Sequence, residues 1–290
     1  MSQSSAAQAE SDFSSLYDIT GRTVVITGGT GVLGAGITRL LAARGAQVGV
    51  LCRNADRGKQ LLKDLGEFAS RVELFAADVL DRDSLQKSCT EVLARFAKVD
   101  CLVNAAGGNQ PRATTSRDLS FFDLPADALK SVFDLNLLGT ILPSQVFGKV
   151  MAAQGHGVIL NVSSMNSFRP LTRIPAYSAA KAAVSNFTQW LAVHMAQEYS
   201  PNIRVNAIAP GFFLTNQNRF LLTDQKTGEL TERGKSIVAH TPMRRFGQPE
   251  DLFGTVLVAL SCVVVCDWYG SGHRWRFCGV LRSVGRTRAK

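Results

Sequence analysis

Short apolar runs alternate with longer segments of helical pattern along most of this 290-residue chain. The apolar runs are Thr23–Thr27, Val48–Leu51, Val72–Phe75, Cys101–Val103, Val158–Val162 and Ile203–Ile208. The helical segments include Thr38–Arg44, Leu85–Phe96, Leu129–Met151 and Ala179–Glu198. Apolar runs of this length suit buried strands, and the helices between parallel strands cover both faces of their sheet. The alternation therefore predicts an α/β fold with a doubly wound parallel sheet in a single domain.

A glycine-rich turn directly follows the first predicted strand and opens the next helix. The residues of this turn that we expect to contact a cofactor are Thr27, Gly28, Thr30, Gly31, Val32, Leu33 and Gly34. Glycines let the backbone approach a pyrophosphate, whose negative charge faces the helix N-terminus. Glycine also suits any tight strand-to-helix turn. Its position after the first strand nevertheless favours dinucleotide binding in a Rossmann-type sheet.

Further candidate cofactor contacts stand at the ends of later strands, where ligands bind in such sheets. Asp78 and Val79 suit an adenine amino group, and Asn104, Ala105 and Gly107 are expected to pack around the adenosine half. Each of these residues is ambiguous when taken alone.

The end of the second strand bears on the choice between NAD and NADP. An acidic residue there would accept hydrogen bonds from the ribose diol of NAD. This chain has Cys52 and Arg53 instead, and the Arg53 guanidinium suits the 2′-phosphate of NADP. The alternative is that Arg53 is an ordinary exposed loop residue. The sequence predicts NAD or NADP as the cofactor and favours NADP.

Tyr177 and Lys181 lie four residues apart, and Ser164 lies thirteen residues before Tyr177. Residues at i and i+4 share a helix face, so we expect the Lys181 ammonium beside the Tyr177 phenol. A free tyrosine titrates near pH ~10, and a neighbouring cation lowers its pKa. Ser164 follows a predicted strand, where its hydroxyl can hydrogen-bond a substrate carbonyl. The alternative is that Tyr177 and Lys181 are two ordinary exposed residues on one helix. The presence of the other motifs in the right order favours a role in proton transfer that accompanies hydride transfer.

These motifs together resemble the short-chain dehydrogenase/reductase family over roughly Gly21 to Leu257. The resemblance implies that Tyr177 is the acid/base and that Ser164 polarises the carbonyl. It implies that Lys181 lowers the tyrosine pKa and binds the nicotinamide ribose, and that Asn136 holds a water in the proton relay. Tyr177 and Lys181 thus also become cofactor contacts. The residues that match the segment touching the nicotinamide end are Pro210, Gly211 and Thr215.

One motif departs from the commoner family pattern. The glycine turn reads Thr-Gly-x-x-Gly-x-x-Gly, as in the longer epimerase-like members, rather than Thr-Gly-x-x-x-Gly-x-Gly. The length of the chain and the spacing from Ser164 to Tyr177 still favour a simple reductase.

Three loops are similar to those of the D-mannonate oxidoreductase (fructuronate reductase) branch of the family. They are Asn104–Thr115, Ser164–Thr172 and Ala209–Arg219. A sugar acid needs cations for its carboxylate and amides or hydroxyls for its diols. The matching residues on these loops are Asn109, Arg112, Asn166, Arg169 and Asn218, with solvated side chains as the alternative. The resemblance implies interconversion of D-fructuronate and D-mannonate. A gluconate or 3-oxoacyl reductase, and a catalytically impaired dinucleotide-binding protein, are the other candidates.

Several features of the whole chain narrow the class of protein. Residues 1–18 lack the features of a secretory signal, and no apolar run of about 18 residues exists, so we expect a disordered leader on a cytoplasmic protein without a membrane span. The six cysteines lack zinc-site spacing, which predicts no metal. Much of the net charge of +9 comes from the C-terminal tail, which argues against nucleic-acid binding. The polar segment Phe212–His240 would be a mobile substrate lid within the reductase domain, residues 19–257.

The last segment, residues 258–290, departs from the family pattern and is strongly basic. From Cys262 onward it has six basic residues and one acidic residue. If each codon is read one base later, Trp268 and Trp275 become glycine and nothing else, at positions where the family has glycine. We therefore hypothesise that one base was gained near the Val258 codon. The alternative is a genuine basic tail for a partner or nucleic acid.

The consequence of such a shift would be the loss of the last parallel strand. In that case the sheet edge is exposed, the stability is lower and the homo-oligomer expected of an intact C-terminus is disturbed.

Overall fold

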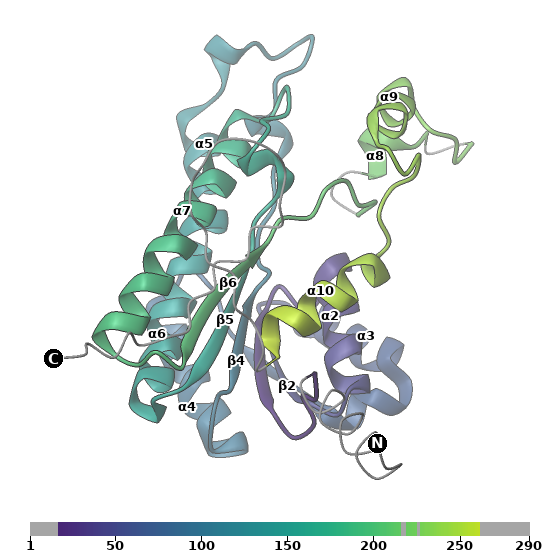
Figure 1. Ribbon diagram of the computed structural model, residues 1–290. Helices are drawn as coiled ribbons and strands as arrows, with labels where there is room; N and C mark the ends of the chain where they lie inside the picture. The colour runs from purple at the N-terminus through teal and green to yellow at the C-terminus, as the bar shows by residue number, and fades with distance from the viewer. Residues whose placement is uncertain (1–16, 216–218, 225–226, 262–290) are drawn as a thin grey trace, which may run out of the picture.

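A computed structural model describes residues 17–215, 219–224 and 227–261. Six parallel strands form one sheet in the order β3-β2-β1-β4-β5-β6 (Figure 1). The strands are β1 (Thr23–Thr27), β2 (Gln47–Cys52), β3 (Val72–Ala76), β4 (Cys101–Asn104), β5 (Gly157–Val162) and β6 (Ile203–Ile208). The chain order reverses at β1, which confirms the predicted doubly wound, Rossmann-type α/β fold.

The apolar runs form strands because helices cover the sheet on both sides. All five residues of β1 are buried, and Ile26 lies between Val50 of β2 and Val103 of β4. A run buried on both faces needs apolar side chains at successive positions rather than at alternate ones. This explains why the strands are recognisable in the sequence.

Two helical layers enclose the sheet. One face is covered by α2 (Val32–Ala43), α3 (Ala55–Leu65) and α10 (Phe253–Leu260). The other face is covered by α4 (Arg82–Phe96), α6 (Gly139–Gln154) and α7 (Pro175–Glu198). The shorter helix α5 (Ala126–Phe133) lies against α7, and a π-helical turn (Asp134–Leu138) joins it to α6. The functional loops follow the carboxyl ends of the strands.

A long excursion leaves the sheet after β6 and carries two helices, α8 (Arg219–Leu222) and α9 (Glu232–His240). In Figure 1 these helices stand apart from the two helical layers. The two ends of the excursion meet where Gly247 N donates to Phe212 O at 2.8 Å and Phe213 forms a parallel bridge with Gly247. The segment predicted as a lid is therefore a closed loop with helices of its own.

The C-terminal helix of the described chain is tied to the sheet through its last carbonyls. Arg22 Nη1 donates to Leu260 O at 3.0 Å, and Asn206 Nδ2 donates to Ala259 O at 3.0 Å. The predicted leader falls mostly, and the predicted loss of the last strand wholly, on residues outside the described ones. The cysteines within the described part, Cys52, Cys89 and Cys101, are free thiols. Among the helices described, none is long and apolar enough to cross a membrane.

Candidate active site

The glycine turn is shaped by contacts that exclude side chains. Gly28 has φ +66°, and a methyl group added there would lie 2.6 Å from the Ala105 backbone. A methyl group at Gly34 would lie 2.1 Å from Gly28 O. Both distances are far below ordinary contact, so the turn can fold between β1 and α2 only with glycine at these two positions.

The start of α2 fits the pyrophosphate of a dinucleotide. Its cap residue, Gly31, offers no side chain to the helix, and the first turn of α2 contains no acidic residue. The first N–H groups of a helix lack intrahelical partners and carry the positive end of its dipole. Gly31, Val32 and Leu33 would therefore hold the diphosphate through their backbone, as expected from the sequence.

The loop after β4 is fixed to the glycine turn by Thr27. Its buried hydroxyl accepts hydrogen bonds from the backbone N–H of Ala105 at 3.2 Å and of Ala106 at 3.1 Å. Thr27 therefore positions the cofactor loops, and its hydroxyl is already engaged within the protein.

Asn104 is expected to pack around the adenosine half, and in the structure its side-chain amide is engaged within the sheet. The amide Nδ2 donates to Asn161 Oδ1 and to Ser144 Oγ, both at 2.9 Å, deep between β4, β5 and α6. Asn161 Nδ2 in turn donates to Thr188 Oγ1 at 2.9 Å. A buried amide must find partners, and these lie inside the sheet rather than in the cofactor cleft.

Arg53 and Asp78, two predicted cofactor contacts, are brought together. Arg53 Nη1 lies 3.5 Å from Asp78 Oδ2, and both side chains keep access to solvent. Asp78 Oδ1 also accepts from Leu80 N at 3.0 Å. Val79 is buried and packs against Gly139 at the start of α6. A phosphate bound by Arg53 would therefore compete with the Asp78 carboxylate for the guanidinium.

The structure gathers Ser164, Tyr177 and Lys181 into one cluster between β5 and α7. Lys181 is 4% exposed, its Nζ donates to Val162 O at 2.7 Å, and the same atom lies 5.7 Å from the centre of the Tyr177 ring. Ser164 is hydrogen-bonded to Tyr177, and its Oγ accepts from Asn166 N at 3.2 Å. The three polar side chains that we expect to carry out proton transfer thus share one edge of the sheet.

The expected effect of Lys181 on the pKa of Tyr177 needs correction. Burial raises the pKa of Tyr177, and the hydrogen bond with Ser164 acts in the opposite direction without overcoming it. Burial also lowers the pKa of Lys181 to about 8. The Lys181 ammonium is bound to a backbone carbonyl rather than to the phenol, and the desolvation of Tyr177 itself determines the direction of the tyrosine shift.

Asn136, the fourth predicted catalytic residue, lies fully buried in the π-helical turn. Its Oδ1 accepts from Gly108 N at 3.1 Å, and its Nδ2 donates to Gly108 O at 2.7 Å and to Val132 O at 2.8 Å. The side chain therefore anchors the loop after β4. The backbone carbonyl oxygen of Asn136 accepts from Thr140 Oγ1 at 2.8 Å.

The loop after β6 carries the remaining predicted cofactor contacts. Pro210 is buried, and its carbonyl accepts from Met165 N at 3.0 Å, which joins this loop to the one behind Ser164. Gly211 is exposed, and Thr215 stands where the excursion towards α8 begins. This hydrogen bond places the segment next to the loop that carries Ser164.

The predicted substrate contacts divide into several groups. Arg112 forms a two-pronged ion pair with Asp127, at 2.9 and 3.2 Å, so its guanidinium already has a carboxylate. Asn109 Nδ2 donates to Thr114 Oγ1 at 2.8 Å. Arg169 is exposed, whereas Asn166 is buried and lines a cavity. Asn218 lies outside the described residues.

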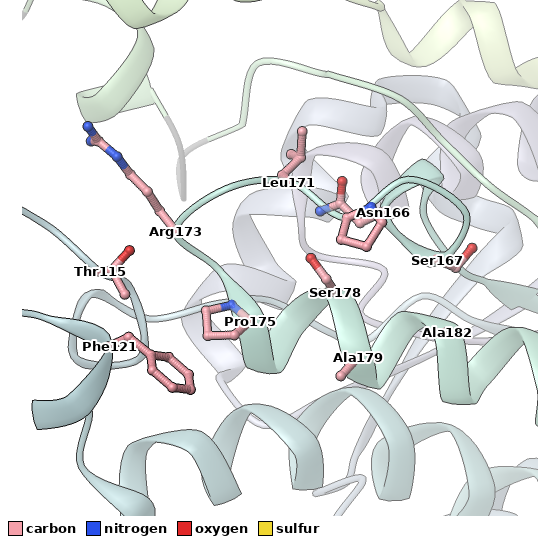
Figure 2. Close-up of a pocket in the computed structure, with 11 residues that line it drawn as sticks. Thr115, Phe121, Asn166, Ser167, Leu171, Arg173, Pro175, Ser178, Ala179 and Ala182 are labelled. Carbon is pink, nitrogen blue, oxygen red and sulfur yellow. The ribbon is translucent and has the colours of Figure 1, made fainter.

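This cavity has a volume of about 420 Å³ and adjoins the start of α7 (Figure 2). It is lined by Ser178, Ala179 and Ala182, which face a different side of α7 from Tyr177 and Lys181. The cavity therefore lies beside the catalytic cluster rather than around it. Its other lining residues include Arg173, and Arg173 on the loop before α7 and Arg233 in α9 carry charges that reach this region. Sequence reasoning missed both arginines, because neither lies in a recognisable motif.

The glycine turn and the Ser164, Tyr177 and Lys181 cluster form the candidate site for a nicotinamide cofactor and its substrate. The sequence profile of the short chain dehydrogenase family matches residues 22–226. An uncharacterized oxidoreductase of Bacillus subtilis is 46% identical over 248 residues, covering 83% of this chain and 88% of the relative. The chain belongs to the short-chain dehydrogenase/reductase family and is an oxidoreductase, as predicted.

Two solved structures are also similar. A candidate D-mannonate oxidoreductase from Haemophilus influenza, with bound NAD, is 39% identical with a TM-score of 0.77, over 84% of this chain and 89% of that chain. A candidate NAD(P)-dependent gluconate 5-dehydrogenase from Beutenbergia cavernae, with bound NADP, is 30% identical with a TM-score of 0.73, over 85% and 92%. The predicted class of cofactor, NAD or NADP, is confirmed by these relationships.

Proposed function

We propose that the protein interconverts a ketone and a secondary alcohol on a sugar acid, with D-fructuronate and D-mannonate as the pair. The observation that carries the proposal is the cluster of buried Ser164 and Lys181 with half-buried Tyr177, together with a glycine turn that suits a dinucleotide. The similarity to a candidate D-mannonate oxidoreductase supports the choice of substrate. The relative described as a gluconate 5-dehydrogenase supports a gluconate as the second candidate.

The cofactor, when bound, supplies the hydride for reduction of the ketone or accepts it from the alcohol. Tyr177 donates its phenolic proton to the substrate oxygen, and Ser164 donates a hydrogen bond to the same oxygen. Because burial raises the pKa of Tyr177, the phenol keeps its proton at neutral pH and is in the form that a reductase needs. The phenolate left behind regains a proton from solvent.

The decisive experiment measures oxidation and reduction of the nicotinamide by its absorbance, with D-mannonate, D-fructuronate and a gluconate series. Tyr177→Phe removes the proton and keeps the ring, so it should reduce kcat by at least about a hundredfold. Tyr199→Phe is the matched control, because Tyr199 is an exposed tyrosine at the far end of α7. Activity on other ketones alone would favour a different reductase, and cofactor binding without turnover would favour an impaired protein.

A homo-oligomer is the proposed form of a chain with an intact C-terminus. An aromatic stack covers the outer face of α7, with Trp190 4.7 Å from His194 and 6.2 Å from Phe187 between ring centres. Trp190 is 57% exposed, which is costly for a large aromatic side chain and supports burial against a second copy. Sedimentation of the wild type and Trp190→Glu tests this, because the charge should dissociate the oligomer.

A further inference from the structure

Arg173 has an uncommon backbone conformation on the loop that leads into α7. Its φ of +77° lies in the left-handed region, which side chains other than glycine, asparagine and aspartate rarely adopt. Thr115 N donates to Arg173 O at 2.8 Å and holds the residue there. Such conformations cluster at binding sites, where the surrounding structure imposes them. Figure 2 shows the side chain extending away from the start of α7 and towards the pale green segment after β6.

Arg233 is carried to the same region by the excursion between β6 and α10. It lies in the first turn of α9, where the Thr231 hydroxyl accepts from Gly234 N at 3.1 Å and caps the helix. Gly234 packs so closely on α8 that an added methyl group would lie 2.3 Å from Leu222 O. The start of α9, and with it Arg233, is therefore fixed within the excursion.

The two arginines affect one another electrostatically. The pKa of Arg233 is lowered first by burial and second by the positive charge of Arg173. Within the described part of the chain, neither side chain takes part in an ion pair. Glu232, the acidic neighbour of Arg233, is paired with Lys235 at 3.0 Å. Two neighbouring guanidinium groups repel each other, and an anion bound by both would relieve this repulsion.

We propose that Arg173 and Arg233 together bind the carboxylate of the substrate. This inference rests on the proposed sugar-acid function. The carboxylate of fructuronate lies several carbon atoms from the ketone, so it belongs at the rim of the site rather than beside Tyr177. Arg173 fits this position because it lies four residues before Tyr177. Guanidinium groups suit this task because they bind carboxylates through paired N–H donors.

This assignment differs from the one expected from the sequence. Arg112 and Arg169 were the predicted cations, but Arg112 is paired with Asp127 at 2.9 Å. The carboxylate-binding role therefore moves from the loop after β4 to one arginine before α7 and one in α9.

The kinetic test compares Arg173→Gln and Arg233→Gln with wild type, using the sugar acid and a neutral polyol or ketose that lacks the carboxylate. Each variant should raise KM for the acid by about ten- to a hundredfold, with a much smaller change in kcat. The kcat/KM for the neutral compound should stay within about twofold. Arg219→Gln is the control, because it removes a positive charge from α8 in the same excursion. Equal losses for acid and neutral substrates would overturn the proposal.

A binding test keeps this inference separate from the proposed function. Thermal unfolding of the protein without cofactor is followed with an unreactive carboxylate, D-tartrate, against chloride at matched ionic strength. Tartrate should raise the melting temperature of wild type and Arg219→Gln, but not of Arg173→Gln or Arg233→Gln. If that pattern holds while no sugar acid is turned over, the anion site stands and the proposed function fails. If sugar acids are turned over and all variants respond equally to tartrate, the anion site fails.

Discussion

The Asn136 side chain binds Gly108 at both ends of the amide, donating to its carbonyl at 2.7 Å and accepting from its N–H at 3.1 Å. This pairing joins the π-helical turn before α6 to the loop after β4. The Asn136 oxygen also lies 2.7 Å from where a side chain at Gly107 would begin. The loop that bounds the cofactor site and the fourth predicted catalytic residue are thus one structural unit.

Replacing Asn136 should therefore destabilise the protein as well as slow catalysis. Asn136→Ala leaves two buried groups of Gly108 without partners, at a cost of about 2 to 4 kcal/mol in the free energy of unfolding. Urea unfolding measures this. Asp134→Ala, in the same turn, removes only the surface pair with Lys130 and should cost less than about 1 kcal/mol. A neutral Asn136→Ala would show that the pairing with Gly108 contributes nothing.

Gly28→Ala should disrupt the cofactor turn. The added methyl group meets the Ala105 backbone at 2.6 Å, and φ +66° strains any other residue. We expect the free energy of unfolding to fall by several kcal/mol. We also expect dinucleotide binding to be lost, which nicotinamide fluorescence measures. Gly254→Ala is the matched control: an added methyl group has nothing within 4 Å, and alanine in a helix favours folding by up to about 1 kcal/mol. Similar melting temperatures for the two variants would contradict this account.

The ion pair between Arg53 and Asp78 should control the preference between the two nicotinamide cofactors. Arg53→Gln removes the cation proposed for the 2′-phosphate and should raise KM for NADPH about tenfold while leaving KM for NADH nearly unchanged. Asp78→Asn frees the guanidinium and should shift the preference towards NADPH at low salt. If neither variant changes the ratio of the two KM values, Arg53 is the ordinary loop residue that the sequence allowed.

The sequence predicted correctly those elements that are determined by residues close together along the chain. Each predicted strand matches an observed one to within about a residue at either end, because double-sided burial leaves continuous apolar runs. The glycine turn was equally readable, since close backbone approach allows few other residues at Gly28 and Gly34. Ser164, Tyr177 and Lys181 met in space because the strand-to-helix connection places them at the same sheet edge.

Contacts between distant segments were not predictable in the same way. The Arg112 guanidinium is bound by Asp127, and the Asn104 amide is bound by Asn161. No local sequence pattern indicates either pairing. Helix α3 was not singled out because only Gly58, Leu61 and Leu65 of its residues are buried. Arg233 gains its importance only because the excursion folds back towards Arg173.

Lys181 should reduce stability in the physiological pH range. Its pKa falls from 10.5 to about 8 on folding, so the unfolded chain binds the extra proton between these two values. The free energy of unfolding contributed by this group therefore rises as pH increases from 8 to 10.5, and the penalty is fully present below pH 8. Lys181→Met removes the charge and should stabilise the protein near pH 7 by roughly 1 to 3 kcal/mol while abolishing turnover.

The advantage of Lys181→Met should shrink as pH rises and be nearly gone above pH 10.5. Denaturant unfolding at several pH values measures it. Lys149→Met provides a comparison because Lys149 is exposed on α6 and also loses a lysine charge. A constant difference between Lys181→Met and wild type from pH 7 to pH 10.5 would show that burial does not shift the lysine.

Restoring the other reading frame after Val258 should stabilise the sheet. In the described part of the chain β6 pairs with β5 alone, and the end of α10 is bound to the sheet through Arg22, Arg204 and Asn206. A strand that follows α10 could then add to the edge at β6 and bury backbone groups that otherwise face solvent. Sequencing the DNA around the Val258 codon tests the proposed extra base directly. The frame-corrected protein should melt several degrees higher, since about 1 kcal/mol shifts the melting temperature by about 2 to 4 °C in a domain of this size. A chain ending at Ser261 separates this gain from any effect of the basic tail, and it should have the same melting temperature as the 290-residue chain.

The opposite result would be a 290-residue chain whose melting temperature equals that of the frame-corrected protein and exceeds that of the chain ending at Ser261. In that case the basic tail is a genuine stabilising part of the fold.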